Sequence, residues 1–514
     1  MILLIIGMCS GVTVSYAQTR IYISDTETWR TTELNQYIGQ RVVFDCPMYV
    51  TSNARGSYSV SPRRLYSPTN QALPLSDEYR SVVSLNNYGA VSISGMPGYH
   101  RCGEIIDNLT VTVQSSNHLR YESGAFVWNT RADMERGIPA LNQKGEPRLV
   151  VCAMNLEYYL VEQFGSLGPA SASEHQKQRA KVSAATKKIA ADVFGFVEVQ
   201  QGSKALAEIA EDLSRNTGHA YEYIDDGGSA NGTYTKSGYV YRSDKVEPIY
   251  QMYHNNTIVQ NRKKIQAFKE TETGEVFLFS LNHFKAKSGS GSGLDADQGD
   301  GQGIFNYSRT QEAQSVVTQY MRVASETQEK DILIMGDLNA YAKEDPITTL
   351  TSKGMLDLHR AFHADSSYSY VFGGKAGYLD HALCNTTLYP QITGMAAYHI
   401  NSDESDEYTY DKSNDRTMFR CSDHDPVLIG LALDGTLEYN PELSISREGN
   451  MLIVSNAHPE LYKSFYAVYT IQGLLLQRAE INSNEFEIPV PNTQGVYIIR
   501  IYHEGKVSTK KISI

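Results

Sequence analysis

The sequence lacks the patterns that mark zinc sites and membrane spans. It has only six cysteines, and no C-x-x-C pair or Cys/His cluster occurs, which argues against zinc. Beyond the first 17 residues, no apolar run is long enough to cross a membrane as a helix. Acidic residues outnumber basic ones, and the net charge is −12. Such a chain does not attract polyanions from a distance, so binding them would need local basic groups or bound cations.

The first residues, MILLIIGMCSGVTVSYAQ, are typical of a signal peptide. They combine a short apolar core with small residues, Ser15 and Ala17, ahead of Gln18. The segment has no Lys or Arg, which is unusual for a signal peptide, and the alternative is a buried N-terminal strand. We predict a signal peptide at residues 1–17 and therefore an exported chain.

Removal of that segment leaves five cysteines. An odd number in an exported protein predicts two disulfides and one buried thiol. We predict the pairs Cys46–Cys102 and Cys384–Cys421, and we expect Cys152 to be packed inside an apolar strand.

The length of 514 residues predicts about two to four domains, and 41% hydrophobic residues with 20% charged residues is a globular composition. Residues 19–120 alternate short strands with turns, as in QRVVFDCPMYV, RSVVSLNN, AVSISG and NLTVTVQ, which predicts a small all-β domain. This part has nine Arg, no Lys and eight acidic residues. Arg suits phosphate contacts, although an ordinary β-domain surface is the alternative. Residues 121–147 are predicted to be a linker.

From residue 148 to 433 the pattern changes to strands that alternate with amphipathic helices, which predicts an α/β domain with a large core. Ser173 and Gln176 form a capping-box pattern for a helix to about residue 191, and Ser308 and Gln311 form a second one. Residues 436–514 return to short strands and predict a separate β-sandwich. No strong internal repeat is present.

A glycine-rich segment, KSGSGSGLDADQGDGQGIFNY, separates a strand from the helix at residue 308. Loops of this length are usually functional or disordered. Asp295, Asp297 and Asp300 offer oxygen ligands for a structural Ca²⁺, although the spacing lacks a closing bidentate Glu. The alternative is a solvated loop.

Several apolar strands end in polar side chains. In DILIMGDLNAYAKEDP, the apolar run stops at Gly336 and is followed by Asp337 and Asn339. Residues i and i+2 of an extended chain point to the same face, and open α/β sheets bind ligands at strand ends. The other strand-end residues are Asn155, Glu198, His283, Asp380, Asp423 and His424. One such residue is usually a structural cap, but six or more at one edge would form a site of hard oxygen ligands with two imidazoles.

Oxygen ligands without cysteine favour Mg²⁺, Mn²⁺ or Ca²⁺ over zinc. These ions suit phosphoryl transfer, because they neutralise developing charge and activate water. A carboxylate beside a histidine orients it and raises its pKa, and we predict this pairing for Asp380 and His424.

The motifs NLEYY, GFVEV, SGYVYRSDK, NHFK, MGDLNAYAKEDP, YLDHAL and SDHDPVLIGL resemble, in this order, those of the endonuclease/exonuclease/phosphatase superfamily. The resemblance covers about residues 155–431. ADQGDGQG, YSYVF and AYHINSDE resemble a narrower branch, the secreted bacterial extracellular nucleases. It implies a four-layer α/β sandwich (DNase I-like), flanked here by an N-terminal OB-like β domain and a C-terminal β-sandwich.

The resemblance implies a role for each site residue. Asn155, Glu198 and Asp423 would hold the divalent metal, Mg²⁺ or Mn²⁺. Asp337 would position or deprotonate the attacking water, and Asn339 would support Asp337 and contact the phosphate. Asp380 would orient His424 toward a phosphate oxygen. His283 would contact phosphate or assist the leaving group, and Arg262 would bind phosphate.

Basic residues lie near these motifs in sequence. Lys263 and Lys264 stand where the family has prolines, and two added cations favour a polyanion. Lys285, Lys287 and Arg309 are placed to follow a nucleic-acid backbone. Together they would reconcile a polyanionic substrate with an acidic chain.

The two flanking domains also resemble known modules. The N-terminal domain resembles OB-like modules, which can bind single strands. The C-terminal GVYIIRIYHEGKVSTKKISI resembles a type IX secretion sorting domain. This implies a Gram-negative host, the type IX secretion machinery as a partner, and a location outside the cell or on its surface. The alternative is an ordinary β module.

Three functional hypotheses follow. The first is a secreted, metal-dependent endonuclease acting on extracellular DNA, with RNA as a further candidate substrate. The second is a phosphodiesterase of the same fold acting on a phospholipid head group or a small phosphate ester. The third is a non-catalytic surface protein that binds DNA, against which the intact set of catalytic residue types argues.

Overall fold

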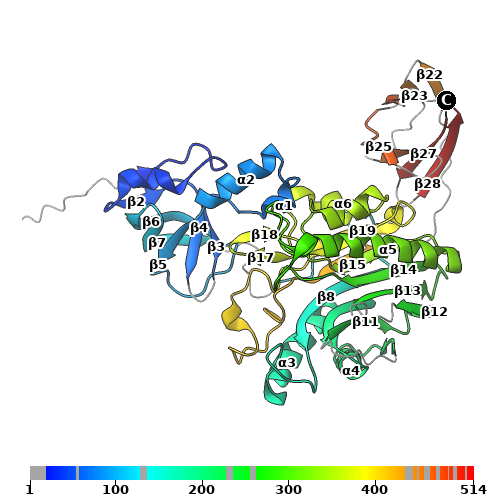
Figure 1. Ribbon diagram of the computed structural model, residues 1–514, viewed down its shortest axis with the longest axis horizontal. Coiled ribbons are helices and arrows are strands. Elements are labelled where there is room, and N and C mark those ends of the chain that lie inside the picture. The colour runs from blue at the N-terminus through cyan, green and yellow to red at the C-terminus, as the bar shows by residue number, and fades with distance from the viewer. Residues whose placement is uncertain are drawn as a thin grey trace, which may run out of the picture. The chain divides into compact units, whose positions relative to one another are not determined.

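The computed structural model describes residues 19–53, 57–127, 136–226, 235–254, 262–433, 444–448, 451–455, 464–470, 475–483, 485–489, 495–503 and 506–513 (Figure 1). The predicted signal peptide at residues 1–17 lies outside them. The chain forms two compact units, residues 1–64 with 85–132, and residues 65–84 with 133–514. Among the described residues, no helix combines the length and apolar character needed to cross a membrane.

The first unit is a β barrel. Its elements are β1 (Thr19–Ile21), η1 (Thr31–Tyr37), β2 (Arg41–Phe44), β3 (Met48–Ser52), β4 (Tyr58–Ser61), β5 (Val91–Ser94), β6 (Ile105–Ser115) and β7 (His118–Val127). The strand order is β1-β2-β6-β3-β4-β5-β7, and β7 also pairs with β6. Five strands, β3 to β7, therefore form a closed ring in which β5 and β7 run parallel. This five-stranded closure agrees with the OB-like prediction.

Two details of this region differ from prediction. RSVVSLNN is not a strand, because it belongs to helix α2 (Asp77–Tyr88). Ser76 Oγ accepts a hydrogen bond from the Tyr79 N–H, and Asp77 and Glu78 supply negative charge in the first helical turn. These capping interactions outweigh the preference of the β-branched residues in this segment for a strand. Strand β7 extends to Val127, into the predicted linker, because it continues to pair with β6.

The second unit contains two six-stranded sheets. One has the order β10-β11-β9-β8-β21-β20 and the other β12-β13-β14-β15-β19-β16. Their strands are β8 (Leu149–Tyr159), β9 (Val193–Gln200), β10 (Tyr221–Tyr223), β11 (Thr235–Arg242), β12 (Val246–His254), β13 (Lys263–Glu270), β14 (Val276–His283), β15 (Ile332–Asp337), β16 (Leu356–Asp357), β19 (Asp380–Cys384), β20 (Ile392–Ala397) and β21 (Val427–Leu431).

Helices cover the outer faces of both sheets. Figure 1 shows the longer helices on opposite sides of the two sheets: α3 (Ala172–Ile189) and α4 (Lys204–Thr217) on one side, α5 (Asn306–Thr327) and α6 (Asp345–Ser352) on the other. Side-chain alternation explains the layers. In β8, Val151 and Ala153 join the core between the sheets, whereas Cys152 and Met154 pack with α3 and α4. This is the predicted four-layer DNase I-like sandwich.

The helices begin close to the predicted positions. Helix α3 is capped by Ser171, two residues before the predicted Ser173, because Ser171 Oγ accepts from the Glu174 N–H. Helix α5 starts at Asn306 rather than Ser308. The remaining elements of this part are α1 (Pro68–Gln71), α7 (Leu358–His363), β17 (Tyr370–Phe372), β18 (Lys375–Gly377), η3 (Gly293–Asp295), η4 (Ala364–Ser366), η5 (Tyr389–Gln391) and η6 (Asp406–Tyr408).

The C-terminal part has two small sheets, ordered β22-β23-β26 and β25-β24-β27-β28. Their strands are β22 (Ser444–Glu448), β23 (Met451–Ser455), β24 (Phe465–Thr470), β25 (Leu475–Glu480), β26 (Phe486–Pro489), β27 (Val496–His503) and β28 (Lys506–Ser513). Leu452 and Ile488 of one sheet share a core with Val468 and Ile499 of the other, as in a β-sandwich.

The two predicted disulfides are not formed, because all five described cysteines are free thiols. Cys384 lies in the core between the two large sheets, whereas Cys421 lies in the core under α3 and α4, so the sheet separates them. Cys102 is buried, and its Sγ donates to the carbonyl of Thr51. Cys152 is buried in β8, as predicted.

Candidate active site

Strand register brings the predicted site residues together. His283 ends β14 opposite Asp337 of the parallel strand β15, and Asp337 lies opposite Asp380 of the antiparallel strand β19. In the other sheet, Asn155 of β8 lies opposite Val197, the residue before Glu198. A hydrogen bond of 3.2 Å from Asn155 Nδ2 to Asp337 Oδ2 joins the two sheets. The site therefore lies where both sheets end.

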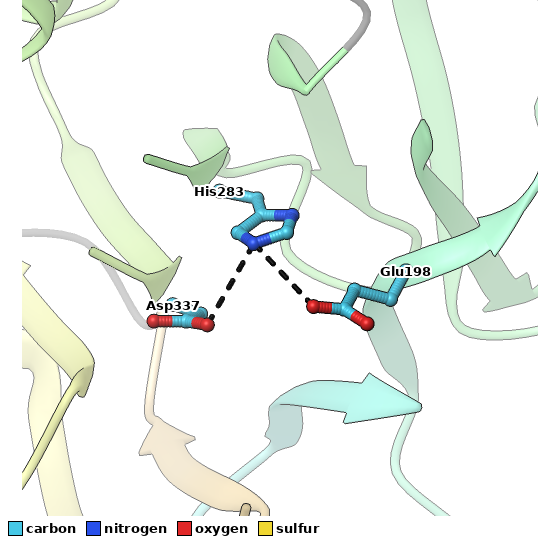
Figure 2. Close-up of side chains that lie close together, drawn as sticks. All are labelled: Glu198, His283 and Asp337. Atoms are coloured by element: carbon cyan, nitrogen blue, oxygen red, sulfur yellow. Dashed lines mark ion pairs between the residues drawn. The ribbon is translucent and has the colours of Figure 1, made fainter. Parts of the chain in front are cut away.

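Figure 2 shows the imidazole of His283 pointing between two carboxylates. Its Nε2 lies 3.5 Å from Glu198 Oε1 and 3.8 Å from Asp337 Oδ2. Burial lowers the pKa of His283 well below its usual range, and the positive charges of Arg262 and His424 add to this effect. The lowered pKa favours the neutral His283 ring, in which one nitrogen donates and the other accepts.

The carboxylates of this cluster hold protons more strongly than usual. Burial raises the pKa of Asp337 to about 7, although the charge of His424 opposes the shift. Burial and then the charge of Asp423 raise the pKa of Glu198. Negative groups are thus concentrated where little solvent reaches them, which is the environment that a divalent cation stabilises.

The donor set fits a hard divalent cation. Ligand atoms of Glu198, His283 and Asp337 lie within 4.8 Å of one another, and Asp337 belongs to a second such group with Asp380 and His424. Asp423 is the most exposed of the predicted ligands, with 29% of its side chain accessible. Carboxylate oxygens without thiolates match Mg²⁺ or Mn²⁺.

Asn155 does not present an oxygen to this cluster. Its Nδ2 donates to Glu198 Oε1 at 3.3 Å and to Asp337 Oδ2, whereas its Oδ1 accepts from the Glu157 N–H at 2.8 Å. In this arrangement Asn155 holds two carboxylates in place, and its role as a metal ligand stays a prediction.

The turn after β15 fixes the orientation of Asp337. Asp337 Oδ1 accepts from the backbone N–H of Asn339 at 2.8 Å, and Oδ2 accepts from Asn339 Nδ2 at 3.2 Å. Nδ2 also donates to the carbonyl of Phe284, so both N–H groups of the Asn339 amide are used. Asn339 therefore supports Asp337 through two hydrogen bonds, and its contact with a phosphate stays a prediction.

His424 and Asp380 form the predicted pair. Nδ1 of His424 lies 2.7 Å from Asp380 Oδ2, which also accepts from Ser369 Oγ. Burial alone would lower the pKa of His424, but the carboxylates of Asp380 and its acidic neighbours outweigh it and hold that pKa well above its usual value. The raised pKa favours the imidazolium form of His424, and its Nε2 lies 3.9 Å from Asp337 Oδ2.

Arg262 contributes through both its charge and its backbone. Its carbonyl accepts from the His283 N–H at 3.0 Å and from Ser237 Oγ at 2.9 Å. Its charge lowers the pKa values of His283 and Glu198. It is partly exposed, which leaves it accessible at the rim of the site.

Sequence reasoning missed Glu157, Ser237 and Ser369. Burial and then Asp423 raise the pKa of Glu157 to about 8, which places a further carboxyl group beside the site. The motif NLEYY contains Glu157, but the spacing of the motif does not reveal that this residue has a positive φ of 48° or that it lies near the site. Ser237 and Ser369 act through hydrogen bonds to distant parts of the chain, for which the sequence carries no signal.

The structure corrects the predictions for four basic residues. Lys263 and Lys264 are buried, paired with Glu312 and Asp226 respectively, so they do not add an exposed cationic surface. Lys287 is ion-paired with Glu344. Arg309 is fully buried and donates to backbone carbonyls of the preceding loop. Each of these cations has a partner within the folded chain, which charge counting along a sequence cannot show.

The three aspartates of the glycine-rich loop accept hydrogen bonds from separate nearby groups. Asp295 accepts from the N–H and Oγ of Ser308, which fixes the start of α5. Asp300 accepts from Gln302, and Asp297 from the Gly299 N–H. Among the described residues, the two groups able to hold a metal are both in the strand-end cluster. The predicted Ca²⁺ site is therefore not supported.

Comparison with known proteins assigns the family. The model of the Endonuclease/Exonuclease/phosphatase family matches residues 128–424, and the chain belongs to this family. Its members are hydrolases of phosphate esters that generally depend on divalent metals. No curated protein matches the chain.

Solved structures resemble this chain at low sequence identity and low TM-score. An endonuclease/exonuclease/phosphatase from Bacteroides vulgatus is 16% identical, with a TM-score of 0.37, covering 55% of this chain and 98% of the other. A mannosyl-6-phosphatase from Bacteroides thetaiotaomicron is 18% identical, with a TM-score of 0.38, covering 55% and 99%. The human Nocturnin catalytic domain is 12% identical, with a TM-score of 0.36, covering 55% and 93%.

Proposed function

We propose that this chain is a secreted, metal-dependent endonuclease that hydrolyses phosphodiester bonds of extracellular DNA, with RNA as a second candidate substrate. The observation that carries the proposal is the pairing of a fixed carboxylate, Asp337, with the ring of His424: Asp337 Oδ2 and His424 Nε2 lie 3.9 Å apart at the same sheet edge. Hydrolysis of a phosphodiester needs both a group that activates water and a cation that faces the phosphate.

Each residue has a distinct task in this proposal. Asp337 takes the proton of the attacking water while Asn339 holds it in one orientation. His424 donates its Nε2–H to a phosphate oxygen while Asp380 holds Nδ1. The bond from phosphorus to the leaving oxygen breaks, and that oxygen takes its proton from a solvent water. The neutral His283 ring can donate a hydrogen bond to the departing oxygen while keeping its own proton. A divalent cation held by Glu198 and Asp423 would neutralise a non-bridging oxygen.

The test is a nicking assay on supercoiled plasmid. The mature chain with Mg²⁺ is expected to produce nicked, then linear, then short products, and EDTA should abolish them. Asp337→Asn should lower the rate by about 10²–10⁴-fold, because it removes the base. Glu326→Gln, an exposed carboxylate on α5, is the matched control and should cleave at the wild-type rate.

The alternative hypotheses are outcomes of the same test. Intact plasmid and intact RNA, with hydrolysis of a phospholipid or a small phosphate ester, would overturn the nuclease proposal in favour of another phosphodiesterase. Binding of DNA without cleavage of any phosphate ester would favour a non-catalytic surface protein.

Export is part of the proposal. The signal-peptide pattern at residues 1–17 and the terminal pattern of residues 436–514 support secretion from a Gram-negative cell through the type IX machinery. A reporter fused to residues 436–514 should reach the medium of a cell that has this machinery and stay inside a cell that lacks it. Retention in both cells would contradict this part of the proposal.

A further inference from the structure

An exposed aromatic side chain stands at the end of a row of rings that begins in the active site. Tyr370 stacks on His424 with ring centroids 4.6 Å apart, and Phe372 stacks on Tyr370 at 6.4 Å with nearly parallel planes. Tyr370 and Phe372 are two residues apart on β17, so they share a face. Phe372 is 68% exposed, which is unusual for a side chain of this type.

The strand that carries Phe372 is held firmly. Strands β17 and β18 form a hairpin closed by Gly373 and Gly374, both with positive φ, as a tight two-residue turn requires. On its outer side, Ala376 of β18 exchanges backbone hydrogen bonds of 2.8 Å with Leu65 and Ser67. Phe372 is therefore carried by a hairpin whose backbone is fixed by hydrogen bonds on its outer side.

The inner end of the hairpin is joined to the catalytic pair. Ser369, directly before β17, donates through Oγ to Asp380 Oδ2, the oxygen that also contacts His424. The Ser369 carbonyl accepts from the Asp425 N–H at 2.8 Å. The position of the Phe372 ring is consequently tied to that of the imidazolium that would face a phosphate.

We propose that Phe372 stacks against a nucleobase next to the scissile phosphate and so makes the enzyme selective for nucleic-acid strands. This inference rests on the proposed nuclease function. A phosphate held by His424 places its flanking base several ångströms farther out along the ring row, where Phe372 offers a free face. An aromatic ring can stack against any of the bases. Lys375, which pairs with Phe372 across the hairpin, adds a positive charge suited to the phosphate backbone of the nucleic acid.

A cycle of protein and substrate changes tests the proposal. The substrate is a short single-stranded oligonucleotide with one cleavable phosphodiester, and matched substrates lack the base on one side or the other of that bond. Phe372→Ala should lower kcat/KM on the full substrate about 5–100-fold, the range expected for one base–aromatic contact. On one of the two abasic substrates, the same substitution should have little further effect, since the stacking partner is absent.

Further variants separate aromatic stacking from simple apolar contact. Phe372→Trp should retain kcat/KM, whereas Phe372→Leu should lose it as Phe372→Ala does. Met321→Ala, which removes a similarly exposed apolar side chain from α5, is the control and should match wild type. Urea unfolding of each variant checks that the exposed substitution leaves the fold intact.

The outcomes are distinguishable. If wild type cleaves the oligonucleotide and Phe372→Ala cleaves each of the three substrates as fast as wild type does, the inference is wrong and the proposed function stands. If Phe372→Leu and Phe372→Ala both keep the wild-type kcat/KM on the oligonucleotide, and Phe372→Ala no longer binds phosphatidylcholine vesicles, Phe372 contacts a lipid surface instead. If wild type cleaves neither DNA nor RNA, the proposed function fails and this inference fails with it.

Discussion

At the scale of single residues, the site depends on how one carboxylate shapes its neighbours. Asp380 accepts from both His424 Nδ1 and Ser369 Oγ at 2.7 Å, and it is buried. A buried imidazolium needs such a partner, because burial alone would favour its neutral form. Asp380 therefore determines both the charge and the orientation of His424.

Replacement of Asp380 by Asn should disable the site without unfolding the protein. Without the negative charge, His424 loses the imidazolium form that would face the phosphate, and we expect the cleavage rate to fall about 10²-fold or more. The measurement is the plasmid nicking rate at neutral pH. Ser369→Ala removes only one hydrogen bond to Asp380 and should cost far less, so equal losses in the two variants would contradict the argument.

Gly336 makes a second prediction at this scale. Its φ is +123°, and a Cβ there would lie 2.0 Å from the backbone carbonyl oxygen of Asn282. Because neither backbone can yield without disturbing β14 and β15, Gly336→Ala should lower the free energy of unfolding by about 3 kcal/mol or more.

The control for Gly336 is Gly354, which also has a positive φ, of 90°, but faces open space. Gly354→Ala should cost only the conformational strain, about 1–2 kcal/mol. Urea unfolding of both variants checks this comparison, and equal costs would show that the close contact at Gly336 is relieved easily.

At the scale of elements, the sequence predicted which polar residues lie at strand ends, but it did not predict which charged side chains are buried. Asp337, His283 and Glu198 each follow an apolar run, and strand register alone then places them together. The segment of helix α2 was predicted as a strand because Val82 and Val83 favour strands. The hydrogen bond between Ser76 and Tyr79 that caps the helix precedes this segment, so the pattern within the segment did not include it. Lys264 was misread because a sequence reports charge, whereas its pairing with Asp226 depends on the folded sheet.

Asp331, at the start of β15, yields a prediction about pH and stability. Burial raises its pKa to about 6, with help from the charge of Glu329 and against hydrogen bonds from Thr387 and Gln391. Since the folded pKa exceeds the unfolded value of 3.8, the folded state binds the proton more tightly. The contribution of Asp331 to stability is therefore complete below about pH 4 and is lost as the pH rises through about 6.

Asp331→Asn should remove this loss. The variant should gain stability over wild type between pH 4 and pH 7, by up to about 3 kcal/mol, because an amide carries no charge to desolvate. The Gln391 side chain can turn to accept from the new amide. Urea unfolding midpoints at several pH values measure the difference, and a difference that does not change with pH would rule out Asp331 as its source.

At the scale of the whole molecule, a segment that lies in sequence between two barrel strands belongs to the catalytic unit. Residues 65–84 connect β4 to β5, yet they fold with residues 133–514. Thr69 Oγ1 donates to Glu344 Oε1 at 2.8 Å, and Asn70 Oδ1 accepts from the Tyr378 N–H at 3.2 Å. Contacts between residues so far apart in sequence could not be read from local patterns, which is why this role was not predicted.

Loss of these contacts should weaken the catalytic unit. Glu344 is fully buried and ion-paired with Lys287, so removal of the Thr69 hydroxyl leaves a buried charged group with one hydrogen bond fewer. Thr69→Val together with Asn70→Ala should lower the free energy of unfolding by about 2–4 kcal/mol. Ser81→Ala, on the exposed side of α2, is the control and should change it by less than about 0.5 kcal/mol.

Activity should fall together with stability in the Thr69 and Asn70 variant. Residues 65–67 also pair with the hairpin that follows Ser369, so disturbing this segment loosens the support of the catalytic pair. We expect a several-fold lower nicking rate at a temperature where the variant is still folded. A variant that loses stability but keeps the full rate would show that residues 65–84 stabilise the catalytic unit without positioning its site.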